Sequence, residues 1–574
     1  MKRDRFPACV ARMDLRLRRR AWRQAHAALA LVCCLALLIG LSGCTMGRKA
    51  SGASIGGSRI QLTDNTFRDP LTSEPTTLDP ATVEDGMTID MLQQIYEGLV
   101  QWNEKNEVVP NLAEKWEVGQ GGTIYTFHLK HGVRFHNGRE VTAADFKYSI
   151  ERACDPETHS QTASSYLNDI VGAMDRITGK PGVTEVSGVK VLDPYTLQIT
   201  IDAPKSYWLD KLTYPTGYVV CKEAIEKSGG KVDETSAIGT GPFKLAEYQH
   251  NYQVILAANP DYHGGRPKLD FIQRPILTDG TTRLNNYEAN QLDRVVIAPR
   301  DLDRINSDPK LAGELHKFAR ANTWYLALNQ DAPDSPFGKR DVRRAFAMAV
   351  DRNEIVRVAL KDQSPVAVGI VPPGFAGYAS TAKLLPYDPA QARNLLAKAG
   401  YPGGKGFPPL TLSFRQDEQQ AQDTCQLVAS QLKNNLGLDI QLRPMEWAAL
   451  LDERSKKTLP FYLIRWSADY LDPQDYLSVM LHTSKKINGK DDHPENGVGY
   501  SNPEFDRLCD QADVEQNQQK RMALYHQAEQ IAIEDAPWAP LFHLNDLELI
   551  KPRVGHIRDS LLGHLPHTTT TVAP

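Results

Sequence analysis

Residues 84–100 read EDGMTIDMLQQIYEGLV, and the apolar side chains in this stretch recur with the period of a helix. Ile89, Leu92, Ile95 and Leu99 fall on one stripe, which predicts an amphipathic helix. The chain that follows alternates short strands with further amphipathic helices.

Strands are predicted where apolar residues alternate. Tyr125, Phe127 and Leu129 alternate as in a half-buried strand. Residues 189–201 fit two strands joined by a turn at 193–194 (DP).

Helix starts are marked by capping residues. Residues 142–145 (TAAD) fit a capping box, and Asp388 and Pro389 fit the start of a helix that Gly400 closes. Residues 503–534 are largely helical in pattern. With 574 residues, 36 Pro and 40 Gly, the chain is predicted to be an α/β protein with several sheets and three or more core-forming units.

The formal charge of −4 hides an asymmetry. Residues 1–43 carry nine Lys/Arg and two Asp, a net of +7, which leaves the remainder near −11. An acidic body has no general attraction for phosphate backbones, so no nucleic-acid partner is expected.

The amino end has the pattern of an export signal. A basic stretch precedes the apolar run 27–41, which is too short to span a bilayer and suits a secretory signal. The run closes on residues 41–44 (LSGC), which resemble the lipobox of bacterial lipoproteins. We therefore expect a signal peptide over 1–43, then a lipidated Cys44 and a flexible tether over 44–59. The alternative is a signal-anchor helix with an incidental cysteine.

Four cysteines remain in the body, namely Cys154, Cys221, Cys425 and Cys509, without CxxC spacing. They are expected as buried small side chains and not as a disulfide framework or a zinc site. No cofactor is predicted.

A series of short motifs runs along the chain from about residue 60 to 555. They are 96–100 (YEGLV) with 109–116 (VPNLAEKW), 135–138 (FHNG) with 141–146 (VTAADF), 239–243 (GTGPF), 259–262 (NPDY) with 267–270 (PKLD), 341–346 (DVRRAF), 466–470 (WSADY) and 534–540 (EDAPWAP). In content and in order they resemble the extracellular solute-binding protein family 5, the oligopeptide-binding type.

The resemblance implies a two-lobed periplasmic-binding-protein-like fold of the cluster C type, with an extra appended domain and hinge crossover strands. By analogy, lobe I combines 60–96, 219–321 and 539–562, the appended domain is 97–218, and lobe II is 322–538. Residues 563–574 are expected to be a frayed tail.

The resemblance also implies a function. The chain is expected to be a binding protein and not an enzyme, lipid-anchored to the cell membrane on its periplasmic or outer surface. It would capture peptides, in particular oligopeptides, and deliver them to the permease and ATPase complex of an ABC transporter, acting as a monomer.

A protein that accepts many peptides must bind what all peptides share, which is the extended backbone and the terminal ammonium. The family's amine-binding aspartate corresponds to Asp469, whose alternative role is a helix N-cap or a surface carboxylate. The segments expected to pair with the peptide backbone are Arg465, Trp466, Ser467 and Ala468 on one side and Glu84, Asp85 and Gly86 on the other. Trp447 and Arg454 match positions that line side-chain pockets.

Two places depart from the family pattern. Ser467 and Ala321 stand where enteric members carry a cysteine pair. Leu463 stands where a further arginine is expected, and Arg465 follows two residues later. The anchoring of a peptide carboxyl end is therefore left open.

Other ligands remain as alternatives. His128, His131 and His136 could form a metal site, since some relatives carry nickel complexes, although a hairpin of exposed histidines fits the pattern better. An oligosaccharide could stack on tryptophans such as Trp324, Trp447 and Trp466. An exported hydrolase is disfavoured because the sequence has no GxSxG, HExxH or P-loop spacing.

Overall fold

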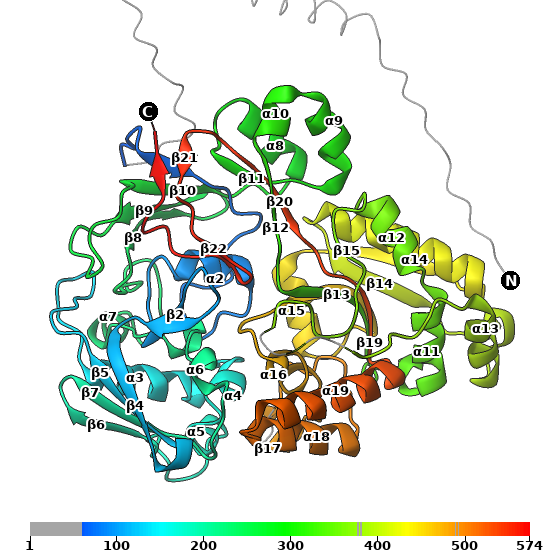
Figure 1. The fold of residues 1–574 in the computed structure, drawn as a ribbon, viewed down its shortest axis with the longest axis horizontal. Helices are drawn as coiled ribbons and strands as arrows, with labels where there is room; N and C mark the ends of the chain where they lie inside the picture. Colours follow the sequence, from blue (N-terminus) through cyan, green and yellow to red (C-terminus); the bar gives the residue numbers. More distant parts are fainter. Residues whose placement is uncertain (1–59, 376–377, 379–380, 488–489, 492, 574) are drawn as a thin grey trace, which may run out of the picture. The chain divides into compact units, whose positions relative to one another are not determined.

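The computed structural model describes residues 60–375, 378, 381–487, 490–491 and 493–573. The predicted signal peptide, Cys44 and the tether lie outside these residues. From Leu62 onward the chain forms one unit, in which the elements gather into two lobes and an appended domain (Figure 1). Within the described ranges, no helix combines the length and the apolar character needed to cross a bilayer.

The first lobe contains two sheets built from distant parts of the chain. One has the strand order β1-β10-β9-β8, with β1 parallel to β10 and the other neighbours antiparallel. The other has the order β11-β20-β12 and is antiparallel. The strands are β1 (Thr66–Arg68), β8 (Phe243–Gln249), β9 (Gln253–Ala258), β10 (Phe271–Pro275), β11 (Arg294–Val296), β12 (Leu315–Phe318) and β20 (Asp546–Ile550). The helices are α2 (Gly86–Leu92), α7 (Lys222–Lys227), α8 (Gly280–Glu288), α9 (Leu302–Ser307) and α10 (Pro309–Gly313).

The appended domain is a four-stranded antiparallel sheet of order β4-β5-β7-β6, with its own buried core. Its strands are β4 (Ala113–Gly119), β5 (Ile124–Leu129), β6 (Val189–Asp193) and β7 (Thr196–Thr200), preceded by the hairpin β2 (Val100–Trp102) and β3 (Val108–Pro110). Its helices are α3 (Ala143–Ala153), α4 (Ala163–Tyr166), α5 (Ala173–Ile177) and α6 (Trp208–Lys211).

The second lobe is a mixed five-stranded sheet of order β15-β14-β16-β13-β19, in which β14 is parallel to both neighbours and β13 is antiparallel to both of its own. The strands are β13 (Asn322–Leu328), β14 (Leu410–Arg415), β15 (Ile440–Met445), β16 (Phe461–Ser467) and β19 (Trp538–Phe542). The helices around it are α11 (Arg340–Ala349), α12 (Arg352–Ala359), α13 (Pro389–Lys398), α14 (Gln419–Leu436), α15 (Trp447–Ser455), α16 (Pro473–Tyr476), α17 (Ser478–Leu481), α18 (Pro503–Val514) and α19 (Gln518–Asp535).

Two crossovers join the lobes, as Figure 1 shows where β12 leads to β13 and β19 leads to β20. Residues 319–321 form the first and residues 543–545 the second. Because all of β19 pairs in the second-lobe sheet, the return to the first lobe begins after Phe542 and not at the predicted boundary of 538.

The carboxy-terminal segment is ordered, in contrast to the frayed tail expected from residue 563. β23 (Gly563–His564) pairs with β22 (Asp559–Ser560), and β24 (Thr571–Val572) pairs with β21 (Val554–Gly555). His567 and Thr570 are buried, so tertiary contacts hold a segment whose composition suggested a loose end.

Several local predictions are confirmed. The capping box at Thr142 forms, Asp388 caps α13 by accepting a hydrogen bond from Gln391 N, and alternate residues of β5 are buried. The four body cysteines are buried and free. The capping box, the cap of α13 and the alternation in β5 depend on residues close together in the sequence.

The helix predicted over 84–100 is shorter in the structure, where α2 ends at Leu92. The carbonyls of Gln94 and Ile95 accept hydrogen bonds from Phe243 N and Gly241 N, at 2.9 and 2.8 Å. These tertiary partners replace the bonds that a continued helix would make, and Ile95 and Leu99 are buried without helical geometry.

Three of the motifs that carried the family resemblance meet at Glu97. Its carboxylate accepts hydrogen bonds from Thr240 Oγ1 at 2.8 Å and Tyr262 OH at 2.9 Å, and His263 Nε2 lies 3.0 Å away. Gly239 belongs to the same contact, because a Cβ there would lie 2.0 Å from the carbonyl oxygen of Ile95. The motif residues therefore hold the first lobe together.

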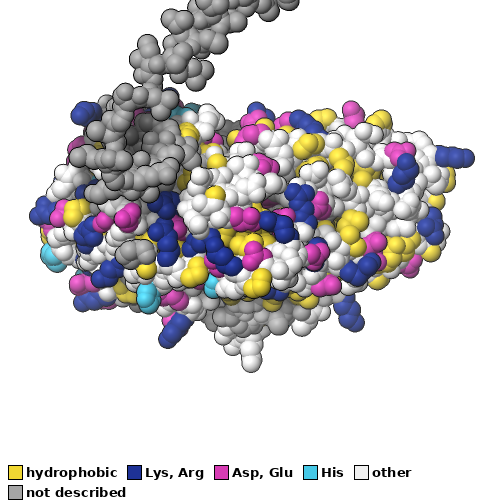
Figure 2. Space-filling view, turned by 90° about the horizontal axis from the view of Figure 1, so that it is seen from above, with side chains coloured by type: hydrophobic (Ala, Val, Ile, Leu, Met, Phe, Trp, Pro, Cys, Tyr) yellow, Lys and Arg dark blue, Asp and Glu magenta, His cyan; other side chains and the backbone are white. Residues whose placement is uncertain are grey.

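Figure 2 shows one face of the protein, on which Lys and Arg side chains are interspersed with Asp and Glu. Opposite charges therefore lie side by side over this face of the protein.

Candidate ligand-binding site

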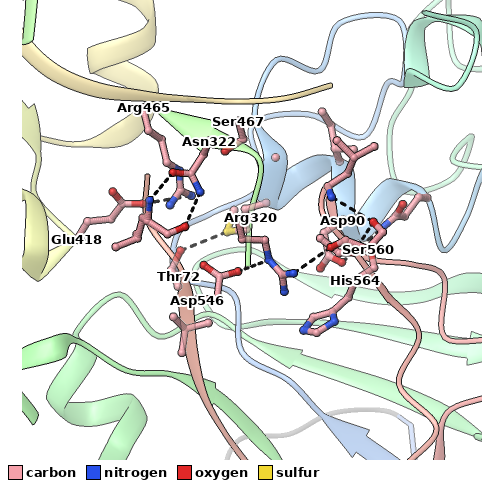
Figure 3. Close-up of a pocket in the computed structure, with 18 of the residues that line it drawn as sticks. Thr72, Asp90, Arg320, Asn322, Glu418, Arg465, Ser467, Asp546, Ser560 and His564 are labelled. Atoms are coloured by element: carbon pink, nitrogen blue, oxygen red, sulfur yellow. Dashed lines mark hydrogen bonds and ion pairs between the residues drawn. The ribbon is translucent and has the colours of Figure 1, made fainter. Parts of the chain in front are cut away.

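A cavity of about 760 Å³ lies between the lobes, within the size range of small-ligand pockets. Both lobes, both crossovers and the appended domain contribute to its wall. Figure 3 shows Arg465 and Glu418 on one side of it and Asp90, Ser560 and His564 on the other, with Arg320 and Asp546 between them.

Five of the predicted site residues line this cavity, namely Gly86, Arg465, Ser467, Ala468 and Asp469. The other five, which are Glu84, Asp85, Trp447, Trp466 and Arg454, are not part of its wall. The structure thus places the end of β16 and the start of α2 at the cleft, and leaves the other five predicted residues outside the cavity wall.

The end of β16 presents backbone groups to the cleft. On one side β13 pairs with it along Phe461–Ser467, and Ala468 N donates to Ala321 O at 2.7 Å. Because backbone groups alternate in direction along an antiparallel ladder, those of Arg465 and Ser467 point away from β13. On the side of β16 that faces away from β13, β14 pairs with β16 at Tyr462 and ends at Arg415. The backbone groups of Arg465 and Ser467 therefore lie past the end of β14.

Asp469 follows this strand and faces the appended domain. Tyr166 OH, from α4, donates a hydrogen bond to Asp469 Oδ2, and the Tyr166 ring stacks on Tyr214 at 3.7 Å. Burial and the nearby charge of Glu495 outweigh the tyrosine hydrogen bond and raise the pKa of Asp469 to about 8. A carboxylate at this place therefore lacks a cation to balance it.

Asp475 supports Asp469 from behind. Its Oδ2 accepts from Trp466 Nε1 at 3.0 Å and from Asp469 N at 3.3 Å, and its side chain is fully buried. Burial and then the charge of Asp469 raise the pKa of Asp475 well above its usual range. Trp466 is thus held against the protein and positions the loop that carries Asp469.

Glu84 and Asp85 differ in role. Asp85 caps α2 by accepting from Thr88 N at 3.0 Å, and it also accepts from Thr76 Oγ1 at 2.6 Å. The pKa of Glu84 is raised to about 7, mainly by burial and then by Glu495. Asp85 is therefore structural, whereas Glu84 belongs to the buried group of charges around Glu495 and Arg454.

Arg454 and Trp447 already have protein partners. Arg454 Nη2 pairs with Glu495 Oε2 at 2.8 Å, and both side chains are buried. The Arg415 guanidinium lies 4.6 Å from the centre of the Trp447 ring. The charge of Arg454 is thus balanced within the protein.

Sequence reasoning missed Arg283 and Arg415, which line the cavity, and Tyr166, which bonds to Asp469. Arg415 donates to Thr72 Oγ1 at 3.2 Å and Ser73 Oγ at 3.4 Å in the first lobe, so it contacts both lobes. No local motif distinguishes these residues, and a signal for them could come only from the folded arrangement.

The three histidines considered for a metal site have different partners. His136 Nε2 lies 3.0 Å from Gly241 O, His128 Nε2 lies 3.4 Å from Glu117, and the His131 ring contacts the Tyr195 ring in a tilted arrangement with 3.8 Å between the ring centres. Among the residues that the structure describes, no group of three or more His, Cys, Asp or Glu is placed to hold a metal ion.

Two lobes, two crossovers and a ligand-sized cleft define the class of two-lobed solute-binding proteins. The sequence profile described as "Bacterial extracellular solute-binding proteins, family 5 Middle" matches residues 107–488. The chain belongs to this family, whose members are binding proteins and not enzymes.

Individual relatives cover most of the chain. The probable deoxycholate-binding periplasmic protein YgiS of Escherichia coli is 32% identical, over 85% of this chain and 90% of its own. The periplasmic oligopeptide-binding protein OppA of Escherichia coli is 30% identical, over 84% of this chain and 88% of its own.

Solved structures show the same fold. The murein tripeptide-binding protein MppA of Escherichia coli has a TM-score of 0.81 at 27% identity, covering 89% of this chain and 98% of its own. The unliganded open form of MppA has a TM-score of 0.62 at the same identity and coverage. The lower score means that the lobes here are arranged differently from that open form. Contacts across the cleft agree with this, because Tyr166 bonds to Asp469, and Gln516 Nε2 donates to Pro204 O at 2.8 Å.

Proposed function

We propose that this chain is the substrate-binding lipoprotein of an ABC importer and that its ligand is a peptide. Relatives named as oligopeptide- and dipeptide-binding proteins support the ligand class, and one solved relative is titled an oligopeptide ABC transporter component. The peptide would lie extended in the cleft, with its amine at Asp469.

The exposed backbone row of β16 supports strand pairing with the guest. Arg465 and Ser467 offer N–H and C=O groups beyond the end of β14, where an extended peptide can add as a further strand. Gly86 lines the cavity from the opposite lobe. Backbone pairing is independent of side chains and suits a binder of many sequences.

Asp469 is the observation that carries the proposal. A carboxyl group whose pKa is raised to about 8 by burial is poised to gain from a cation, because a guest ammonium would restore the charged carboxylate. The guest then supplies the counter-charge that the protein lacks at this position.

Calorimetric titration of trialanine and N-acetyl-trialanine tests this assignment. Acetylation removes the ammonium, and Asp469→Asn removes the carboxylate, so each should weaken binding at least tenfold, since hydrogen bonds between charged groups contribute about 1.5–3 kcal/mol. Combining the two changes should cost little more than either alone. Equal affinity for both peptides in the native protein would refute the role of Asp469.

A second ligand class follows from the relative named for deoxycholate. Deoxycholate carries a carboxylate but no amine, so it would leave Asp469 unpaired. A thermal-shift screen with tripeptides, deoxycholate, an oligosaccharide and a nickel chelate separates the classes, because a ligand at 100 times its Kd adds about 2.7 kcal/mol of stability.

Anchoring and delivery complete the proposal. Lipidation of Cys44 would hold the protein at the cell membrane, and closure of the lobes around a peptide would present the loaded form to the permease. The binding protein would act as a monomer.

A further inference from the structure

The hairpin β22–β23, which the sequence assigned in part to a frayed tail, forms one wall of the cavity. Residues 560–566 all line the cavity. The two residues at the tip of the hairpin, Leu561 and Leu562, are half-buried. Gly563 follows them with a φ of 125°, a backbone conformation that favours glycine. The carboxy-terminal segment is therefore part of the cleft.

The base of this hairpin is fixed to the first lobe. His564 Nε2 lies 3.0 Å from Glu548 Oε2 in β20, and both side chains are buried. The carbonyl of His564 also accepts a hydrogen bond from Gln93 Nε2, just after α2, at 2.9 Å. Because both contacts are made within the first lobe, the hairpin moves with that lobe.

The middle of the hairpin is bonded to the crossovers. Arg320, in the first crossover, donates to Ser560 O at 3.0 Å and to Asp546 Oδ2 at 2.6 Å, and Figure 3 shows it between these two residues. Asp546 directly follows the second crossover. The next residue of the first crossover, Ala321, donates its N–H to Leu561 O at 2.9 Å. The hairpin therefore lies along the hinge, beside both crossovers.

The tip of the hairpin reaches the other parts of the protein. Leu561 N donates to Asn106 Oδ1 at 2.8 Å, in the turn between β2 and β3 that precedes the appended sheet. The side chains of Leu561 and Leu562 pack against the core of the second lobe. Leu561 Cδ1 lies against Gly374 of that lobe, where an added Cβ would be only 2.8 Å away. One short hairpin thus contacts both lobes, the first crossover and the turn before the appended sheet.

Opening the lobes about the crossovers carries Gly374 away from a hairpin whose base stays with the first lobe. The apolar side chain of Leu561 then becomes exposed to water, which costs free energy. We propose that the β22–β23 hairpin is a clasp on the hinge, in which Leu561 holds the second lobe closed and so sets how long a guest is retained. The inference goes beyond the proposed ligand class, because the clasp acts on any guest that the lobes enclose.

The release rate of a guest tests the clasp. Stopped-flow mixing of the full-length protein with trialanine can be followed by tryptophan fluorescence, because Trp102 lines the cavity. Leu561→Ala should speed dissociation about fivefold to tenfold and change association by less than about twofold. Leu561→Met keeps the side-chain volume and should stay within about twofold of the native rate. Leu192→Ala, at a side chain 53% exposed on β6, is the control and should change neither rate.

A second variant loosens the tip without changing the apolar side chain. Asn106 has a φ of 62°, which glycine adopts freely, so Asn106→Gly removes the amide that holds Leu561 N without straining the turn. Dissociation should become about twofold to threefold faster, as expected for the loss of one hydrogen bond. Asn290→Gly is the matched control, because Asn290 has a φ of 59°, is exposed and lies outside the cavity wall.

The separation of the lobes in the ligand-free protein gives a second readout. Spin labels at Lys268→Cys in the first lobe and Lys433→Cys in the second, both exposed positions, report the distribution of distances between the lobes. Leu561→Ala should shift this distribution toward longer distances. A substitution that only weakens the fold would lower the melting temperature and leave both the distances and the release rate unchanged.

The outcomes separate the clasp from the proposed function. If Leu561→Ala and Asn106→Gly release trialanine at the native rate, the clasp is wrong, and the amine site still stands where N-acetylation weakens binding. If trialanine does not bind, the peptide function fails, and the same rates measured with deoxycholate decide the clasp. If neither guest binds, unchanged distances in ligand-free Leu561→Ala overturn the clasp, and longer distances support it.

Discussion

Peptide affinity should depend on pH through Asp469, and the structure sets the size of the effect. The buried carboxyl group has a pKa of about 8. Only its ionised form pairs with an ammonium, so the free protein must lose a proton before or as the peptide binds. In the complex the peptide ammonium favours the ionised carboxylate and lowers the pKa of Asp469. The peptide affinity therefore rises with pH below about 8.

The magnitude follows from the ionised fractions. At pH 6 about 1% of a group with a pKa of about 8 is ionised, and at pH 7.5 about a quarter is. The peptide amine, with a pKa of about 7.7–8.0, loses part of its charge over the same interval. Affinity should therefore rise about tenfold to twentyfold from pH 6 to pH 7.5 and fall again above pH 8.

Calorimetry in two buffers of different ionisation enthalpy measures both the peptide affinity and the number of protons released on binding. Near pH 6.5 we expect close to one proton released per trialanine bound. Asp469→Asn should remove the proton release and flatten the profile below pH 7.5, whereas Asp452→Asn, at an exposed ion pair with Lys456, should change neither. Constant affinity from pH 6 to 7.5 with no proton release in the native protein would refute the reasoning.

Three further predictions concern stability and location. Arg454→Met leaves Glu495 buried without its partner and should lower the free energy of unfolding, measured by urea titration, by about 3–5 kcal/mol. Arg443→Met removes an exposed ion pair and should lower it by less than about 1 kcal/mol. Equal losses in the two variants would contradict the stabilising role of the buried pair. Burial raises the pKa of Glu548, but pairing with Arg294 and His564 outweighs burial and lowers it. The stability that Glu548 gives to the folded protein is therefore present above pH 4.5 and is lost as the pH falls below that value. Glu548→Gln should therefore destabilise the protein at pH 7 and flatten the acid side of its stability profile. A variant that loses stability in acid as steeply as the native protein would count against this prediction. Cys44→Ala should move the protein from the membrane to the soluble fraction, and continued membrane association would rule out the lipid anchor.

The amino-acid sequence by itself determined the features whose causes are local. The capping box at Thr142, the helix opened by Asp388 and the alternation in β5 depend on residues within a few positions of one another. The family motifs were also readable, because close packing at Gly239 and the bonds to Glu97 allow few substitutions. These signals were sufficient for the fold class and for placing Asp469 at the cleft.

Only the tertiary structure decided which groups compete for the same partner. Helix α2 stops at Leu92 because residues about 150 positions away bond to the carbonyls that would continue it. Arg454 has its charge balanced by Glu495, whereas Arg283 and Arg465 are brought to one cavity from different lobes. Burial and charge balance are set by neighbours in space, and sequence spacing does not encode those distances.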